Sequence, residues 1–122
     1  MGDDVTLDEL RRRLGEDDLV LIDVRTEPEF DGSAPTPCDP RHGHIPGARN
    51  VPLDRLYTAR SADDVRALIG AAEGAEVVAY CHSGSRSAFA AQVLRAAGYV
   101  ARNYVGSWHE WSRDASLPLE VG

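Results

Sequence analysis

The sequence contains few cysteines and no long apolar run. Two cysteines among 122 residues are too few for a disulfide scaffold. No stretch approaches the roughly 18 consecutive apolar residues that a membrane-spanning helix requires. The first residues, Met1-Gly2-Asp3-Asp4, have neither the basic nor the apolar region of a signal peptide. We therefore expect a cytoplasmic protein in a reducing compartment, with no membrane partner.

Basic residues are also in short supply. The chain has 13 lysines and arginines against 20 aspartates and glutamates, a net charge of −7. A field of this sign repels nucleic acids and anionic membrane surfaces, so neither is expected as a partner. An anionic substrate would have to be attracted by local positive charge.

What the sequence does have is a core of adequate size and an alternation of strand and helix patterns. Its 43% hydrophobic content suffices for one compact domain over residues 1–122. Apolar runs predict strands at 19–24, 48–51, 76–80 and 99–103, with a very short first strand ending at Val5. Helical spacing with capping residues predicts helices at 7–14, from Thr26, at 65–72 ending at Gly74, and near Trp108. This alternation indicates an α/β domain with three layers and a mainly parallel sheet.

The most informative stretch is residues 77–87, which reads VVAYCHSGSRS. The apolar run that ends at Tyr80 is typical of a strand buried on both faces. Beyond the polar segment, apolar residues recur at helical spacing, and Gly98 stands where that helix would end. The residues on this face are Phe89, Ala90, Val93, Leu94 and Ala97. The pattern predicts a strand, a six-residue loop that begins at Cys81, and a helix.

Cys81 is the candidate nucleophile. At the carboxyl end of a strand, its sulfur would face loop N–H groups and the positive end of a helix dipole, with Arg86 nearby. Such surroundings lower a cysteine pKa from about 8.5 to roughly 3.5–7.5, which favours the thiolate. The alternative is a buried structural cysteine, which the polar neighbours His82, Ser83 and Ser85 argue against.

Asp23 and Arg25 lie where the second predicted strand emerges into a loop. Ligands of open α/β sheets gather at the carboxyl ends of strands, so Asp23 could lie near Cys81 if the two strands are neighbours. The alternative, which we favour, is a hydrogen-bonded pair that holds loops together.

Other candidates are better explained by structural roles. His44 has no second ligand at metal spacing, and we expect it to be structural. Residues 31–41 hold three prolines and should form a surface loop. Cys38 in this loop is expected to be a bystander, with a resolving or regulatory thiol as the alternative. Trp108 and Trp111 are three residues apart and are expected to pack in the core rather than contact substrate.

Four stretches, in this order, resemble the rhodanese-like sulfurtransferases. Residues 21–25 (LIDVR) resemble the end of a family strand, and residues 43–52 (GHIPGARNVP) resemble the GHIPGA signature. Tyr80-Cys81 with its loop is similar to the active-site segment, and residues 104–111 (YVGSWHEW) resemble the GSWxEW signature. The long segment between Phe30 and His44 looks more like the catalytic C-terminal half of two-domain family members. The resemblance implies a rhodanese-like α/β/α fold with a five-stranded sheet of order 3-2-4-5-1.

The resemblance also implies a chemistry. The Cys81 thiolate would take the outer sulfur of thiosulfate as a persulfide and pass it to a thiol, to a protein or, in an assay, to cyanide. The residues that would bind the substrate are His82, Ser83, Gly84, Ser85, Arg86 and Ser87, with Asp23 and Arg25 in support. Neither a cofactor nor a metal is called for.

Three other functions stay open on the sequence. Ser83-Gly84 also resembles the loop of 3-mercaptopyruvate sulfurtransferases. A cysteine phosphatase or arsenate reductase uses a similar strand, loop and helix. The phosphatase loop resembles His-Cys followed by five residues and an arginine. Here Tyr80 stands before Cys81 and only four residues separate Cys81 from Arg86, so both the histidine and the loop length are missing. A non-catalytic binding module is the third, and inactive modules commonly lose the cysteine that is present here.

Overall fold

The structure is a computed structural model that describes residues 4–34 and 37–122. Two short segments lie outside the described residues. They are Met1 to Asp3, which formed part of the signal-peptide prediction, and Pro35 and Thr36 of the predicted loop. The elements in chain order are β1 (Asp4–Val5), α1 (Leu7–Arg13), β2 (Leu19–Asp23), α2 (Glu27–Asp31), β3 (Arg49–Asn50), α3 (Leu53–Thr58), α4 (Ala62–Ile69), β4 (Glu76–Tyr80), α5 (Ser85–Ala96), β5 (Val100–Tyr104) and α6 (Ser107–Trp111).

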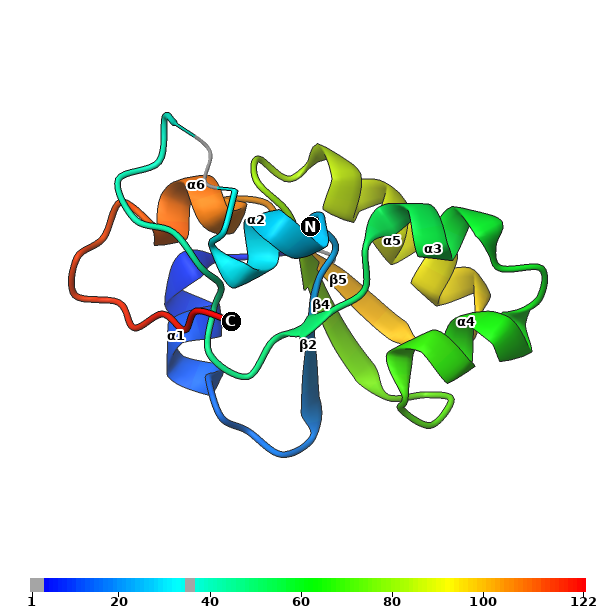
Figure 1. The fold of residues 1–122 in the computed structure, drawn as a ribbon. Helices are drawn as coiled ribbons and strands as arrows, with labels where there is room; N and C mark the ends of the chain where they lie inside the picture. Colours follow the sequence, from blue (N-terminus) through cyan, green and yellow to red (C-terminus); the bar gives the residue numbers. More distant parts are fainter. Residues whose placement is uncertain (1–3, 35–36) are drawn as a thin grey trace.

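The five strands form one sheet in the order β3-β2-β4-β5-β1, and every neighbouring pair is parallel. This confirms the predicted order. β2 and β4 lie side by side in the middle, with Asp23 opposite Tyr80 (Figure 1). Because parallel strands end at the same edge of a sheet, the segments that follow Asp23 and Tyr80 emerge next to each other.

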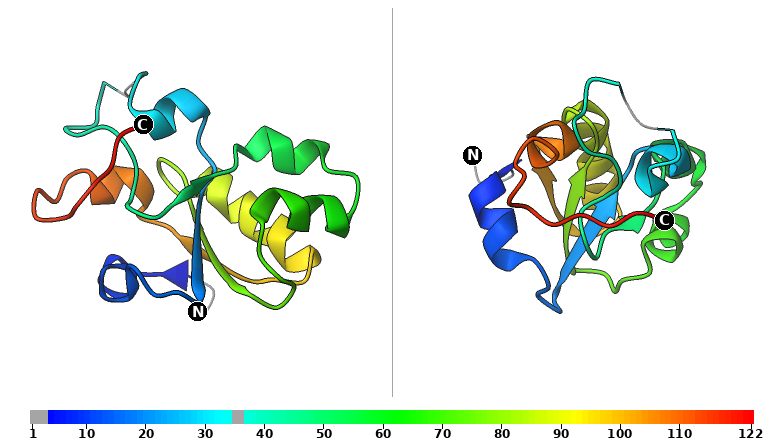
Figure 2. Two further views of the ribbon diagram at one scale, coloured as in Figure 1. Left: turned by 60° about the horizontal axis from the view of Figure 1, so that its bottom comes forward. Right: turned by 60° about the vertical axis from the view of Figure 1, so that its left-hand side comes forward.

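Helices cover both faces of the sheet (Figure 2). Side chains alternate along β4, so Val77 and Ala79 pack on one face and Val78 and Tyr80 on the other. The first face is covered by α3, α4 and α5, and the second by α1 and α6. Cys81 continues the alternation and belongs to the first of these two cores. The three-layer α/β/α architecture is therefore the predicted one.

Several element boundaries differ from the predictions. α4 ends at Ile69 because Gly70 takes the left-handed conformation, with φ of 77°, and donates its N–H to the Arg66 carbonyl. The predicted end at Gly74 was therefore wrong. α3 was not predicted, since a helix of six residues is too short to show a clear period.

One predicted core residue lies on the surface. Phe89 is 56% exposed and makes an edge contact with Tyr57 of α3, at 6.5 Å between ring centroids. Ala90 and Leu94 of α5 face the sheet as predicted. No helix of the described residues is long and apolar enough to cross a membrane.

Candidate active site

The segment between β4 and α5 is tighter than predicted. α5 begins at Ser85, so the turn comprises Cys81 to Gly84 instead of six residues. Gly84 has φ of 96°, and a Cβ added there would lie 2.6 Å from the Val105 carbonyl oxygen. Only glycine meets both conditions without strain, and the turn therefore depends on it.

Hydrogen-bond donors surround the Cys81 sulfur. The Gly84 N–H donates to Sγ at 3.1 Å, and the Ser87 hydroxyl donates at 3.4 Å. Burial of Cys81, which is 1% exposed, works to raise the pKa of the thiol. The Ser87 hydroxyl and the N–H groups of Ser83, Gly84 and Ser87 outweigh burial, so this pKa lies below its ordinary value. Cys81 is as buried as a purely structural cysteine would be, but the hydrogen-bond donors around its sulfur favour the thiolate.

Ser107 supports Cys81 from the start of α6, and the sequence prediction missed it. Its hydroxyl accepts the Cys81 backbone N–H at 3.1 Å and lies 4.0 Å from Sγ. It also donates to the Tyr104 carbonyl at 2.8 Å. Ser107 has φ of 55°, which is unusual for a residue with a side chain. Its place between Gly106 and Trp108, in the stretch that resembles GSWxEW, was the available signal.

Arg86 is ion-paired, which the sequence did not indicate. Its guanidinium donates to both carboxylate oxygens of Glu29, at 2.9 and 3.3 Å. Burial works to raise the pKa of Glu29, but Arg86 and Thr26 outweigh it and hold that pKa at about 2. Glu29 is visible in the sequence only as the last residue of a capping box that begins at Thr26. The positive charge beside Cys81 is thus partly offset.

The remaining predicted loop residues are His82, Ser83 and Ser85. Ser83 and Ser85 are exposed. The His82 ring turns toward Asp39, with Nε2 at 3.1 Å from the carboxylate. Among the described residues, the side chains of these three residues donate no hydrogen bond to Cys81 Sγ. The structure therefore brings Gly84 and Ser87 to the sulfur directly, whereas Ser83 contributes through its backbone.

Asp23 and Arg25 form the structural pair that we favoured from the sequence. Both side chains are buried, and the guanidinium donates to Asp23 at 2.8 to 3.1 Å. Arg25 also donates to the Gly43 carbonyl at 2.6 Å and lies over the Trp108 ring at 5.0 Å from the centroid. The pair thus ties the end of β2 to the segment before β3 and to α6.

The other structural predictions are also confirmed. His44 is buried, stacks on Phe30 at 3.6 Å, and lies with Nδ1 2.8 Å from the Phe30 carbonyl oxygen. Trp108 and Trp111 are buried in the core, and each indole N–H donates to a backbone carbonyl.

A cavity of about 510 Å³ opens beside Arg86. Its lining carries the charged residues Glu27, Asp54, Arg55 and Arg86, together with Val24, Thr26, Pro52 and Leu53. Cys81 is not part of the lining. The cavity offers space next to the Arg86 guanidinium for a small polar molecule.

Comparison with known proteins identifies the family of this chain. Residues 6–114 match the family described as Rhodanese-like domain. The chain is 35% identical to a probable 3-mercaptopyruvate sulfurtransferase of Pseudomonas aeruginosa, covering 93% of this chain and 43% of the relative. It is also 35% identical to the sulfur carrier protein TtuD of Thermus thermophilus, covering 84% of this chain and 41% of the relative.

A crystal structure of a probable thiosulfate sulfurtransferase superimposes with a TM-score of 0.82 at 44% identity. The match covers 97% of this chain and 47% of that one. The chain thus spans less than half the length of each of these three proteins. The family match covers most of the chain, and the sheet order agrees with it. The chain therefore belongs to the rhodanese-like sulfurtransferase family.

Proposed function

We propose that the protein is a thiosulfate sulfurtransferase in which Cys81 is the catalytic nucleophile. The observation that carries the proposal is the position of the Cys81 sulfur, which receives the Gly84 N–H at 3.1 Å and the Ser87 hydroxyl at 3.4 Å. A thiolate that accepts these bonds is held in place and ready to attack. Residues 1–122 are proposed to act as one domain.

The reaction has two balanced steps. The Cys81 thiolate attacks the outer sulfur of thiosulfate, and a new sulfur–sulfur bond forms on Cys81. The sulfur–sulfur bond of thiosulfate breaks, and its electron pair leaves with sulfite. An acceptor then attacks the outer sulfur of the persulfide and restores the thiolate. Cyanide gives thiocyanate in an assay, and a thiol or a protein is proposed as the cellular acceptor.

The turn supplies what these steps need. Negative charge stays on sulfur throughout, and the N–H groups of Ser83, Gly84 and Ser87 provide donors for it. Arg86 is proposed to hold the sulfonate of the donor, in competition with Glu29. Ser83 and Ser85 would donate hydrogen bonds to the bound donor. The steps require neither a cofactor nor a metal.

The relatives are named for different sulfur-transfer roles, so the sulfur donor and the sulfur acceptor of this protein are proposals. The chain resembles a protein named for 3-mercaptopyruvate, one named for thiosulfate and a sulfur carrier protein. The last of these supports a protein as the acceptor. The cytoplasmic location stays a prediction from composition.

The donor is tested by comparing kcat/KM for thiosulfate and 3-mercaptopyruvate, with cyanide as acceptor. We expect thiosulfate to be preferred, because the Arg86 guanidinium favours a doubly charged anion over a singly charged one. Glu29 offsets part of this charge, so the preference should be severalfold rather than absolute. A preference for 3-mercaptopyruvate would overturn the assignment of thiosulfate as the donor but would leave the proposed mechanism intact. A phosphate ester serves as control, and its hydrolysis without sulfur transfer would favour the phosphatase alternative.

Two substitutions test the Arg86–Glu29 pair in opposite directions. Arg86→Ala should raise the KM for thiosulfate by roughly tenfold or more, because a charge-assisted hydrogen bond contributes about 1.5–3 kcal/mol. Glu29→Gln should lower this KM severalfold, since it removes the carboxylate that competes for the guanidinium. Glutamine also suits the capping box, so α2 should remain intact.

Steady-state kinetics with varied thiosulfate, together with thermal unfolding of each variant, gives the comparison. An unchanged KM in Arg86→Ala would contradict the proposed role of Arg86. A raised KM in Glu29→Gln would mean that Glu29 orients the guanidinium rather than competing for it.

A further inference from the structure

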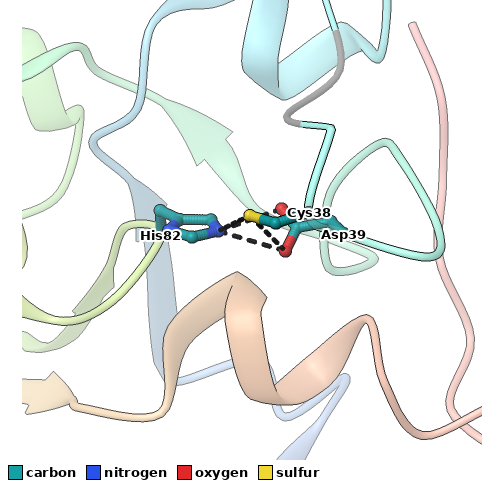
Figure 3. A group of neighbouring side chains, drawn as sticks. All are labelled: Cys38, Asp39 and His82. Carbon is teal, nitrogen blue, oxygen red and sulfur yellow. Dashed lines mark hydrogen bonds and ion pairs between the residues drawn. The ribbon is translucent and has the colours of Figure 1, made fainter.

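Three potential metal ligands meet beside the active-site turn (Figure 3). Cys38 and Asp39 reach from the loop before β3 toward His82. Cys38 Sγ lies 3.9 Å from His82 Nε2 and 3.9 Å from Asp39 Oδ1. His82 Nε2 lies 3.1 Å from the Asp39 carboxylate, and one atom from each residue falls within 4.8 Å of the others. A thiol, a carboxylate and an imidazole thus converge on one point.

The Asp39 carboxylate is buried and only partly satisfied. Asp39 is 5% exposed, and its Oδ2 has no hydrogen-bond partner among the described residues. The approach of His82 Nε2 to Oδ2, at 3.1 Å, does not have the geometry of a hydrogen bond. Oδ1 is the oxygen that is bonded: His82 Nε2 lies 3.1 Å from it in hydrogen-bond geometry, and Arg113 donates to it at 3.2 Å. The other terminal nitrogen of Arg113 donates to the Cys38 carbonyl. A buried carboxylate oxygen without a partner is unfavourable, and it points into the cluster.

We propose that Cys38, Asp39 and His82 form a site for a thiophilic divalent cation such as Zn²⁺. Zinc binds sulfur at about 2.3 Å and nitrogen or oxygen at about 2.0–2.2 Å, so two ligands of one tetrahedral ion lie roughly 3.3–3.6 Å apart. The separations of His82 Nε2 from Cys38 Sγ, at 3.9 Å, and from Asp39 Oδ2, at 3.1 Å, need shifts of only a few tenths of an ångström, which the exposed Cys38 side chain can make.

The chemistry of the ligands selects the ion. A thiolate with an imidazole suits Zn²⁺ and Co²⁺, whereas Mg²⁺ and Ca²⁺ prefer oxygen ligands. The thiolate and the carboxylate bring two negative charges, which balance a divalent ion. Arg113 holds Oδ1 and leaves Oδ2 for the metal, as an outer-shell partner does in many metal sites.

The site would tie the loop before β3 to the active-site turn. His82 directly follows Cys81, so a metal on His82 would fix one end of the turn. Cys38 then has a role other than the bystander expected from the sequence. The inference does not depend on the proposed sulfur transfer, because its test measures metal binding.

The test is a titration of the 122-residue protein with Co²⁺, followed by absorption, and with Zn²⁺, followed by calorimetry. We expect one equivalent to bind and a thiolate-to-cobalt charge-transfer band to appear. Cys38→Ser should lose the band, and both Cys38→Ser and Asp39→Asn should weaken Zn²⁺ binding by at least about tenfold. Cys81→Ser is the matched control, since it removes the other thiol and should keep the band and the stoichiometry. Mg²⁺ should produce no binding heat.

Several results would overturn the proposal. These are a cobalt spectrum without a thiolate band, a band that survives in Cys38→Ser, and a band that disappears in Cys81→Ser. Thermal unfolding of the metal-free variants separates lost binding from lost folding. If Asp39→Asn is too unstable to test because Arg113 loses its partner, the exposed Cys38→Ser decides the question alone.

Discussion

The variant Cys81→Ser is expected to lose sulfur transfer, with kcat reduced by at least about a thousandfold, as when other covalent nucleophiles are removed. Serine nearly matches cysteine in shape, and its hydroxyl can still accept the Gly84 N–H. It stays protonated near neutral pH, however, and cannot carry a sulfane sulfur. The turn should therefore survive while the chemistry stops.

Mass spectrometry of the protein after thiosulfate treatment measures this directly. The wild type should gain the mass of one sulfur, and peptide mapping should place it on Cys81 rather than Cys38. Cys81→Ser should gain none, and its thermal unfolding should stay close to that of the wild type. A sulfur that remains in the variant, or that maps to Cys38, would show that Cys81 has been wrongly assigned.

The variant Asp23→Asn is expected to destabilise the fold by about 3–5 kcal/mol, the usual cost of breaking a buried ion pair from one side. Asparagine keeps the shape of aspartate but removes the charge that balances Arg25. The guanidinium, 2% exposed, would then remain in the core without a counter-charge. Its contacts with Gly43 and Trp108 hold it in place, so it cannot easily turn to solvent.

Urea unfolding followed by circular dichroism gives the difference in the free energy of unfolding. Asp8→Asn is the matched control, because the pair of Asp8 with Arg11 is exposed on α1 and should contribute less than about 1 kcal/mol. Equal effects of the two substitutions would mean that the buried pair is not what stabilises this end of the sheet.

Much of the fold could be predicted from the sequence, because the signals are local. The runs at 19–24 and 76–80 mark the two central strands, and Thr26 with Glu29 marks the start of α2. Such patterns depend on residues a few positions apart, and they survive in any packing. The order of the strands is not local, and it came from the family resemblance rather than from periodicity.

The candidate site divides in the same way. Cys81, its turn and the Asp23–Arg25 pair could be predicted, because each lies within one short stretch of the chain. The partners of that turn could not. Glu29 reaches Arg86 across 57 positions, and Asp39 reaches His82 across 43.

These contacts exist because α2 and the loop before β3 pack beside the carboxyl end of β4. That placement follows from the order of the strands and from the path of the connecting segments at the carboxyl edge of the sheet. No pattern of neighbouring residues encodes either of these. The sequence by itself identified Cys81 as the candidate nucleophile and placed it in a turn between a strand and a helix. The tertiary structure alone decided which charges surround the turn, since charges distant in the chain meet only after the sheet has formed.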